Sequence, residues 1–426
     1  MNWIETPEKV TDAEKDRYDA EEGPPDESWI SSDRFIAQFD GAVDDYLSTL
    51  ITEALKAGAS DFFFTPREDM VDIAIRAMGL LRPWGQITRE FGIRLITHLK
   101  VSANMDILRA FLPQDGRIRY RLANGESIDL RLATLPTMEG EDLTIRILDS
   151  RNMLGMEDIG FHRTNFNRLY NIVSQPGGLI LVTGPTGMGK TTTLYATLKH
   201  LNDGTRKIHT LEDPIEYTLD GLHQSQINLS RGIDFPDLLR GILRQSPDVI
   251  MVGEIRDGIT ADIVVRAANS GQLVLATSHA RSTVEACEAM LFLGVQPQFF
   301  ASCLLGVVTQ RLVRKLCPFC KLPLHSEDNG GEEQQMYVPV GCPECNHSGY
   351  KGRVAVGEVL KISPDIEKMI RDGSTMYQIH QKAVDEGMVD LRTDAQDKLE
   401  KGLTSVDEIL RAVPGQFADY NLKKSL

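Results

Sequence analysis

Apolar residues recur at helical spacing near the start of the foldable chain, at Val43, Leu47, Leu50, Ile51, Ala54 and Leu55. This spacing predicts one apolar helix face, and Gly58 ends the helix. β-prone runs follow at 61–64, 71–77, 117–122, 127–133 and 143–148, and a second helical stretch lies near 89–102. The pattern predicts a small α+β domain with an antiparallel sheet over residues 42–148, followed by a linker at 149–158.

After residue 160, apolar strands alternate with helices. The predicted strands are 179–183, 207–212, 249–252 and 273–277, and the predicted helices lie near 191–200, 235–244, 261–268 and 284–294. This alternation predicts a second, α/β domain over 159–413, built on a parallel, doubly wound sheet. We place a cysteine-bearing insert at 317–352, and we expect the remainder to be helical as far as Val413, with a polar tail at 414–426.

Composition adds limits to this picture. The chain has 426 residues and a net charge of −15, and much of the acid lies in residues 1–41, which we predict to be a disordered acidic tail. The acidic balance disfavours a nucleic-acid-binding surface. No apolar run approaches the ~20 residues of a membrane span, and the N-terminus lacks the features of a signal peptide. We therefore expect a cytoplasmic protein, with any membrane role peripheral.

A glycine-rich run joins the predicted strand 179–183 to the following helix. It consists of Gly184, Pro185, Thr186, Gly187, Met188, Gly189, Lys190, Thr191 and Thr192. Strand, glycine loop and helix are the context of a phosphate-binding P-loop, in which backbone N–H groups surround the phosphates. Lys190 would reach the β- and γ-phosphates, and the Thr191 hydroxyl would bind Mg²⁺. The alternative is an ordinary glycine-rich turn.

Three polar groups follow the predicted strands. Glu254 ends the run 247–254 as a Walker-B-like carboxylate that could orient a water molecule or support the metal. Glu212 closes another strand within an acidic cluster, and His279 follows the strand 273–277 as a candidate γ-phosphate sensor. Each could be an ordinary loop or structural residue. Because ligands bind at the carboxyl edge of such sheets, we expect these groups near the phosphates.

Two arginines outside the nucleotide domain are candidates for the same site. Arg117 and Arg131 lie on predicted strands of the first domain, where arginine side chains usually face solvent. The functional alternative is that they reach the phosphates from a neighbouring domain or subunit, as arginine fingers. The residues alone leave both possibilities open.

Four cysteines form two C-x2-C pairs, Cys317 with Cys320 and Cys342 with Cys345, separated by 21 residues. Each pair can supply two thiolates to a tetrahedral Zn²⁺ ion. Four thiolates fill the coordination sphere, which indicates structural rather than catalytic zinc. A redox role is the remaining alternative, and a disulfide pair is disfavoured in a reducing cytoplasm.

Together these motifs resemble the secretion ATPases that assemble type II secretion systems and type IV pili. The run 184–195 is similar to their Walker A box, 212–217 to their aspartate box, 243–257 to their Walker B box and 270–279 to their histidine box. The runs 112–117, 310–320 and 341–353 extend the resemblance, which covers about residues 42–413.

The resemblance implies a hexameric ring of ATPases at the cytoplasmic face of the inner membrane. A PAS-like domain would precede a RecA-like domain, and Arg117 and Arg131 would contact the nucleotide. Glu254 would take the place of the catalytic glutamate. The ring would drive a membrane platform protein, with cytoplasmic docking proteins, to assemble pilins. The four cysteines match the zinc insert of the assembly branch.

This chain departs from the family pattern at several positions. Gln272 stands where the histidine box usually has its first histidine, and glutamine can hydrogen-bond but cannot carry a charge. Phe62, Phe63 and Phe64 replace a more polar run. The other functions that the residues allow are a nucleotide-gated scaffold, which would not need Glu254 or His279, and a DNA-handling motor, which the acidic balance disfavours.

Overall fold

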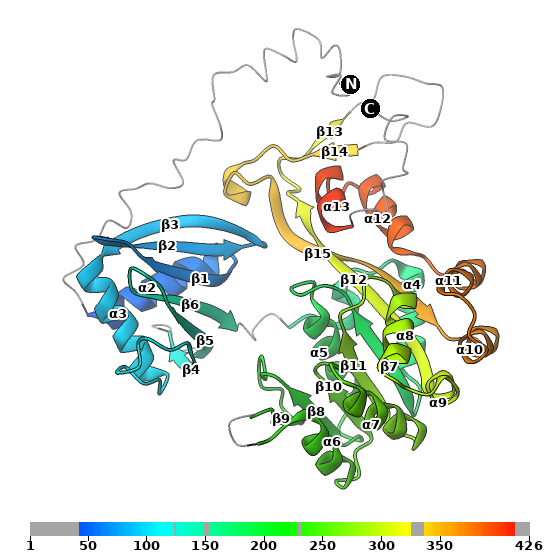
Figure 1. Cartoon of the computed structure of the whole chain (residues 1–426). Helices are drawn as coiled ribbons and strands as arrows, with labels where there is room; N and C mark the ends of the chain where they lie inside the picture. The colour runs from blue at the N-terminus through cyan, green and yellow to red at the C-terminus, as the bar shows by residue number, and fades with distance from the viewer. Residues whose placement is uncertain are drawn as a thin grey trace, which may run out of the picture. The chain divides into compact units, whose positions relative to one another are not determined.

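The computed structural model describes residues 42–122, 125, 127–148, 153–228, 232–324 and 336–413. Both predicted tails, 1–41 and 414–426, and part of the predicted linker lie outside these ranges. The chain divides between Arg151 and Asn152 into two compact units, which are described separately (Figure 1). A short 3-10 helix, Met156–Ile159, packs in the core of the second unit, which therefore begins before the predicted residue 159.

The first unit is a six-stranded antiparallel sheet with the strand order β3-β2-β1-β6-β5-β4. Its strands are β1 Ala59–Pro66, β2 Met70–Ala77, β3 Leu80–Thr88, β4 Gln114–Arg121, β5 Ser127–Pro136 and β6 Glu141–Leu148. Helices α2 (Val43–Lys56) and α3 (Arg89–Ser102) share one apolar core with the sheet. The predicted α+β class is confirmed, and the likeness to a PAS domain stays a prediction.

Strand β3 is absent from the sequence-based prediction. It carries Pro83 and Gly85, residues that normally argue against a strand. It lies at the edge of the sheet and pairs only with β2, where the register shifts between Ile73 and Ala74. A proline is tolerated at such an edge because one side of the strand needs no ladder partner.

The second unit is a seven-stranded sheet with the order β15-β12-β7-β11-β10-β8-β9 (Figure 1). Its strands are β7 Gly178–Thr183, β8 Ile208–Glu212, β9 His223–Gln226, β10 Val249–Val252, β11 Leu273–Ser278, β12 Leu304–Leu316 and β15 Tyr350–Lys361. All neighbouring pairs are parallel except β12 with β15. The predicted parallel α/β sheet is confirmed.

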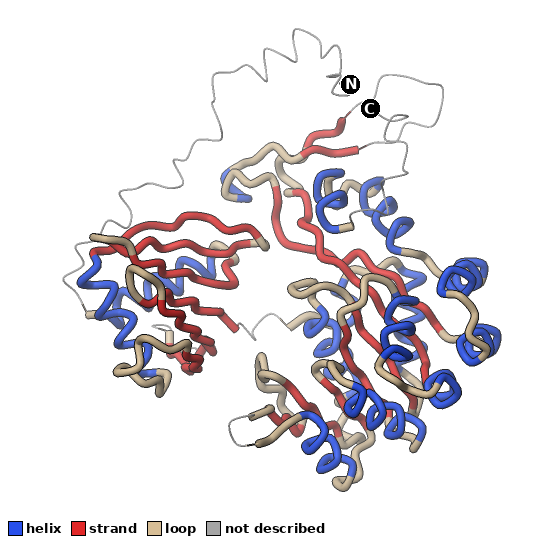
Figure 2. The backbone as a smooth tube through the Cα atoms, in the orientation of Figure 1, coloured by secondary structure: helices blue, strands red, loops and turns tan. Residues whose placement is uncertain are grey.

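Helices cover both faces of this sheet (Figure 2). One layer contains α4 Arg163–Val173 and α5 Lys190–Leu201, and the other contains α6 Phe235–Leu243, α7 Gly258–Asn269, α8 Thr283–Phe292 and α9 Pro297–Cys303. Alternate strand residues supply the two cores: Leu179 and Leu181 face one layer, and Ile180 and Val182 face the other. The central strands are therefore apolar on both faces, which explains why they are continuous hydrophobic runs.

The prediction for the region after the cysteine insert was partly wrong. Residues 350–361 form β15, which pairs with the long strand β12, rather than continuing from insert to helix. Only then do the helices α10 Pro364–Arg371, α11 Met376–Asp385, α12 Leu391–Glu400 and α13 Val406–Ala412 follow. The buried carboxylate of Glu358 on β15 accepts hydrogen bonds from the backbone N–H groups of Thr283 (2.8 Å) and Leu391 (3.3 Å). It thereby ties the first turns of α8 and α12 to the sheet.

Candidate active site

The glycine run forms a loop between the buried strand β7 and the N-terminus of α5. Gly184, Gly187 and Gly189 have φ values of 143°, 78° and 80°, a region that side chains with a Cβ rarely adopt. At Gly184 a Cβ would also lie 2.6 Å from the carbonyl oxygen of Gln310. The backbone can therefore curl tightly and point N–H groups inward, so the loop fits the phosphates of a nucleotide.

The Lys190 side chain folds back over this loop. Its Nζ atom donates to the carbonyl oxygens of Gly184 (2.6 Å) and Pro185 (3.2 Å) and lies 3.4 Å from Nδ1 of His279. Burial lowers the pKa of the Lys190 amine, a shift that the nearby carboxylate of Glu254 opposes. The amine is thus held at the loop by neutral acceptors that a phosphate oxygen could replace.

Glu254 and His279 come together at the carboxyl edge of the sheet, after β10 and β11. Nε2 of His279 lies 2.6 Å from Oε1 of Glu254, while Nδ1 of the same ring faces Lys190. Nε of Arg256 donates to Oε2 of Glu254 at 2.7 Å, and the Arg256 guanidinium also pairs with Asp213 at 3.7 Å. Lys190, His279 and Glu254 therefore form one connected polar cluster, as the strand order predicts.

Glu212 has a different environment from the other predicted site residues. Its carboxylate is buried and accepts hydrogen bonds from the Tyr195 hydroxyl, from Thr210 at 2.6 Å and from Gln224 at 3.1 Å. Burial and the Glu212 charge raise the pKa of Tyr195. Within the described residues, Glu212 makes no hydrogen bond or ion pair with Lys190, Glu254 or His279. Its contacts indicate that it holds α5 against β8, so we assign it a positioning role.

Gln272, which stands where the histidine box usually has its first histidine, lies away from His279 and the glycine loop. It directly precedes β11, whereas His279 directly follows that strand. A strand of six residues spans about 20 Å, so the two residues lie at opposite edges of the sheet. Gln272 therefore does not share the cluster that His279 forms with Lys190 and Glu254.

Arg117 and Arg131 belong to the first unit, where they lie directly opposite one another on β4 and β5. Arg117 pairs with Asp129 at 3.3 Å and Arg131 with Asp115 at 3.8 Å, and each arginine side chain is a little over one third exposed. Arg146 on β6 lies opposite Arg131 and extends the row across the sheet. The structure thus brings the two predicted arginines together on one accessible sheet face.

Two polar residues were missed as site residues: Arg256, which contacts Glu254, and Gln310, which contacts the loop. Arg256 follows Glu254 in the Walker-B-like run, and its position two residues beyond the carboxylate was the available signal. Gln310 lies on β12, which was not predicted as a strand, and it is almost fully buried. A buried amide inside an apolar run is a usable signal, because such a group must have hydrogen-bond partners.

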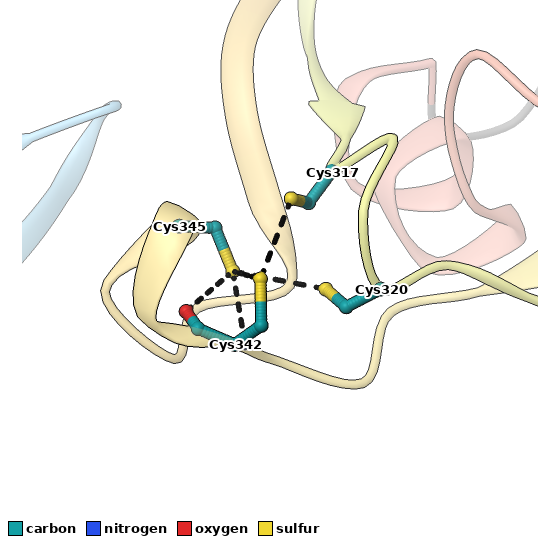
Figure 3. Close-up of side chains that lie close together, drawn as sticks. All are labelled: Cys317, Cys320, Cys342 and Cys345. Atoms are coloured by element: carbon teal, nitrogen blue, oxygen red, sulfur yellow. Dashed lines mark hydrogen bonds between the residues drawn. The ribbon is translucent and has the colours of Figure 1, made fainter.

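The four cysteines converge at the ends of β12 and β15, although the pairs are separated in sequence (Figure 3). The Sγ atoms of Cys317 and Cys342 are 3.9 Å apart, and those of Cys320 and Cys345 are 3.8 Å apart. A disulfide would require ~2.0 Å, whereas four thiolates at ~2.3 Å from one Zn²⁺ ion lie about 3.8 Å from each other. The arrangement therefore fits a tetrahedral metal site.

Backbone donors support the thiolates of this cluster. The N–H groups of Cys342 and Gly349 lie 3.2 and 3.3 Å from Sγ of Cys345, and the N–H of Gly341 lies 3.3 Å from Sγ of Cys320. Such donors stabilise negative sulfur and orient it, as the outer shell of a structural metal site does. Cys287 and Cys303, which we expected to be core residues, are indeed buried in α8 and α9, and burial raises the pKa of both thiols.

We expect Cys342→Ser to release the metal from the purified protein. The substitution removes one of four thiolates, so it should weaken metal binding by more than the roughly 10–100-fold loss typical of an outer-shell change. Metal content per chain and the thermal unfolding midpoint measure the effect. The matched control is Cys287→Ala, a buried cysteine outside the cluster, which should keep its metal. A full equivalent of zinc in Cys342→Ser would contradict the four-thiolate site.

Within the described ranges, no helix combines the length and the apolar character needed to cross a membrane.

Comparison with known proteins identifies relatives of known structure and sequence. The chain resembles the crystal structure of the pilus retraction motor PilT with bound ADP, with a TM-score of 0.63, 24% identity, and 86% of this chain and 97% of that chain covered. It also resembles the ATPase DotB of Legionella pneumophila, with a TM-score of 0.69, 20% identity, and coverage of 87% and 96%. At these identities the likeness shows the fold alone, which is RecA-like.

Sequence relatives are more similar. Type II secretion system protein E of Aeromonas hydrophila is 39% identical over 401 residues, which cover 92% of this chain and 79% of the relative. The type IV pilus assembly ATPase PilB of Pseudomonas aeruginosa is 40% identical over 384 residues, covering 87% and 68%. The model of the type II/IV secretion system protein family matches residues 37–411. The chain therefore belongs to the type II/IV secretion system protein family.

Proposed function

We propose that this chain is an ATP-hydrolysing motor that powers assembly in a type II secretion system or a type IV pilus. The observation that carries the proposal is the cluster of Lys190, His279 and Glu254 beside the P-loop. The relatives of this chain include proteins named type II secretion system ATPase E, from Vibrio cholerae, and type IV pilus assembly ATPase PilB. The same cluster argues against a scaffold that only binds nucleotide, because such a scaffold needs no carboxylate beside the lysine.

Each residue of the loop and of the neighbouring cluster would have a distinct role in ATP hydrolysis. The backbone of residues 184–192 would bind the phosphates of ATP, and Lys190 would leave the carbonyls of the loop for the β- and γ-phosphate oxygens. Thr191 would ligate Mg²⁺, whose charge would stabilise the phosphate oxygens. Glu254, fixed by Arg256 and His279, would orient the water that attacks the γ-phosphorus. The P–O bond to the β-phosphate breaks, and ADP and phosphate are released.

We further propose that the chain works as a homohexamer at the cytoplasmic face of the inner membrane. Arg117 and Arg131, which are accessible on one sheet face and pair there with Asp129 and Asp115, would reach the phosphates of a neighbouring subunit. An inner-membrane platform protein and cytoplasmic docking proteins would receive the motion. Zn²⁺ at the four cysteines would stabilise the fold without joining the reaction, and we expect no nucleic acid to bind.

A subunit-mixing experiment tests the site and the ring together. We expect Arg117→Ala and Glu254→Gln each to lower ATP turnover strongly, the arginine variant by about 10³-fold if it is an arginine finger. In a random equal mixture of the two, roughly a quarter of the sites would join an intact Glu254 to an intact Arg117 from the next subunit. Turnover of the mixture should therefore recover well above that of either variant.

The control for this experiment is Arg94→Ala, an exposed arginine on α3 of the same unit. It should leave turnover near that of the unaltered chain. A mixture that is no more active than its two components would contradict the trans arrangement. Wild-type turnover by Arg117→Ala alone would show that Arg117 has no role in ATP hydrolysis.

A further inference from the structure

Gln310 lies on β12, the strand next to β7, which leads into the P-loop. β12 runs parallel to β7, with Thr309 opposite Thr183, the last residue of β7 before the loop. Gln310 is 1% exposed, and its main-chain carbonyl oxygen is the atom that a Cβ at Gly184 would meet. A buried amide at this place must have its donors and its acceptor satisfied by the loop or by α5.

Both ends of the Gln310 amide are engaged. Nε2 donates to the carbonyl oxygen of Met188 at 2.7 Å, and Oε1 accepts from the Thr193 hydroxyl at 2.7 Å. The Met188 carbonyl can only accept, so the NH₂ end of the amide must face the loop. The Thr193 hydroxyl then holds the opposite end. Met188 thus fixes which end of the amide faces the loop, and Thr193, on the first turn of α5, anchors the other end.

The hydrogen bond to Met188 also fixes the next N–H group. In a trans peptide the C=O and the following N–H point in opposite directions. Because Gln310 holds the Met188 carbonyl toward β12, the N–H of Gly189 is turned away from β12. Gly189 has a φ of 80°, and a Cβ there would lie 3.1 Å from Nε2 of Gln310, so this peptide rests closely on the amide.

We propose that Gln310 is a positioning residue for phosphate binding, which orients the Gly189 N–H toward the phosphates and is itself anchored by the Thr193 hydroxyl. This inference rests on the proposed nucleotide site and adds two residues to it. Backbone donors of the P-loop contact the phosphates before and during hydrolysis alike. Loss of their orientation should therefore weaken binding and raise KM, while kcat at saturating ATP changes little.

The test uses the full chain with Gln310→Met and, as a milder variant, Thr193→Val. We expect the Kd for ADP with Mg²⁺, measured by calorimetry, to rise about tenfold in Gln310→Met and by a smaller factor in Thr193→Val. The KM for ATP should rise in parallel, with kcat within about threefold of the unaltered chain. The double variant should bind ADP no more weakly than Gln310→Met alone, because Thr193 acts through the amide.

The matched control is Thr309→Val, the neighbouring residue on β12. Its hydroxyl is buried and has no hydrogen-bond partner among the described residues, so the isosteric change should leave the Kd unchanged. Wild-type ADP affinity in Gln310→Met would overturn the inference, and so would additive losses in the double variant. Absence of ADP binding by the unaltered chain would instead contradict the proposed function, and with it the inference that rests on that function.

Discussion

Replacing Lys190 with alanine is expected to abolish measurable ATP hydrolysis by the purified chain. The amine lies beside the P-loop, within 3.4 Å of His279, and donates to neutral carbonyl oxygens that a phosphate oxygen can replace. Loss of one such charge-stabilising donor costs about 10²–10³-fold in rate. Steady-state phosphate release at saturating ATP measures the effect.

The control for this variant is Lys199→Ala. Lys199 is an exposed lysine near the other end of α5, so its removal changes the net charge by the same amount at a distance from the loop. Its turnover should equal that of the unaltered chain. If Lys190→Ala hydrolyses ATP at the wild-type rate, the loop at 184–192 is not the catalytic P-loop.

Glu254→Gln should separate binding from hydrolysis. The amide keeps the size of the side chain, but it cannot act as the carboxylate that orients the attacking water. We therefore expect kcat to fall by about 10²–10⁴-fold, while the Kd for ADP stays close to that of the unaltered chain. Turnover and calorimetry on the same preparation measure both quantities.

Glu288→Gln is the corresponding control, because Glu288 is an exposed carboxylate on α8 outside the cluster. It should be fully active. Retained hydrolysis in Glu254→Gln would mean that another carboxylate serves the reaction, and Asp213, the second partner of Arg256, would be the first to examine. Loss of ADP binding together with turnover would instead indicate that Glu254 supports the loop.

The fold could be predicted where the physical signal is local. The strands β7, β10 and β11 are buried on both faces and appear as short apolar runs bounded by loops, and α3 was predicted with its observed bounds. β12 and β15 were missed because their pairing is antiparallel and long-range, across the cysteine insert. No local periodicity separates such a strand from a helix that also carries buried residues.

The order of strands and loops in the sequence predicted which polar residues share the site, but it did not predict their tertiary contacts. Parallel strands end at one edge, so the sequence alone predicts that Lys190, Glu254 and His279 lie together. Glu212 ends a strand at that edge too, but the Tyr195 hydroxyl binds its carboxylate within the core, a contact that strand order does not reveal. Gln310 is 122 residues from its partner Met188, and only the tertiary structure shows that they meet.

The antiparallel pair of β12 and β15 has a mechanical consequence. Cys317 directly follows β12, and that strand pairs with β15 from Gly306 to Leu316. The pairing of β12 with β7 ends at Thr309, so beyond that residue β12 and β15 form a two-stranded extension of the sheet that carries the cysteine insert. A force applied to the insert would be transmitted along β12 to Gln310, which hydrogen-bonds the P-loop at Met188. A protein bound to the insert would thereby act on the loop without contacting it.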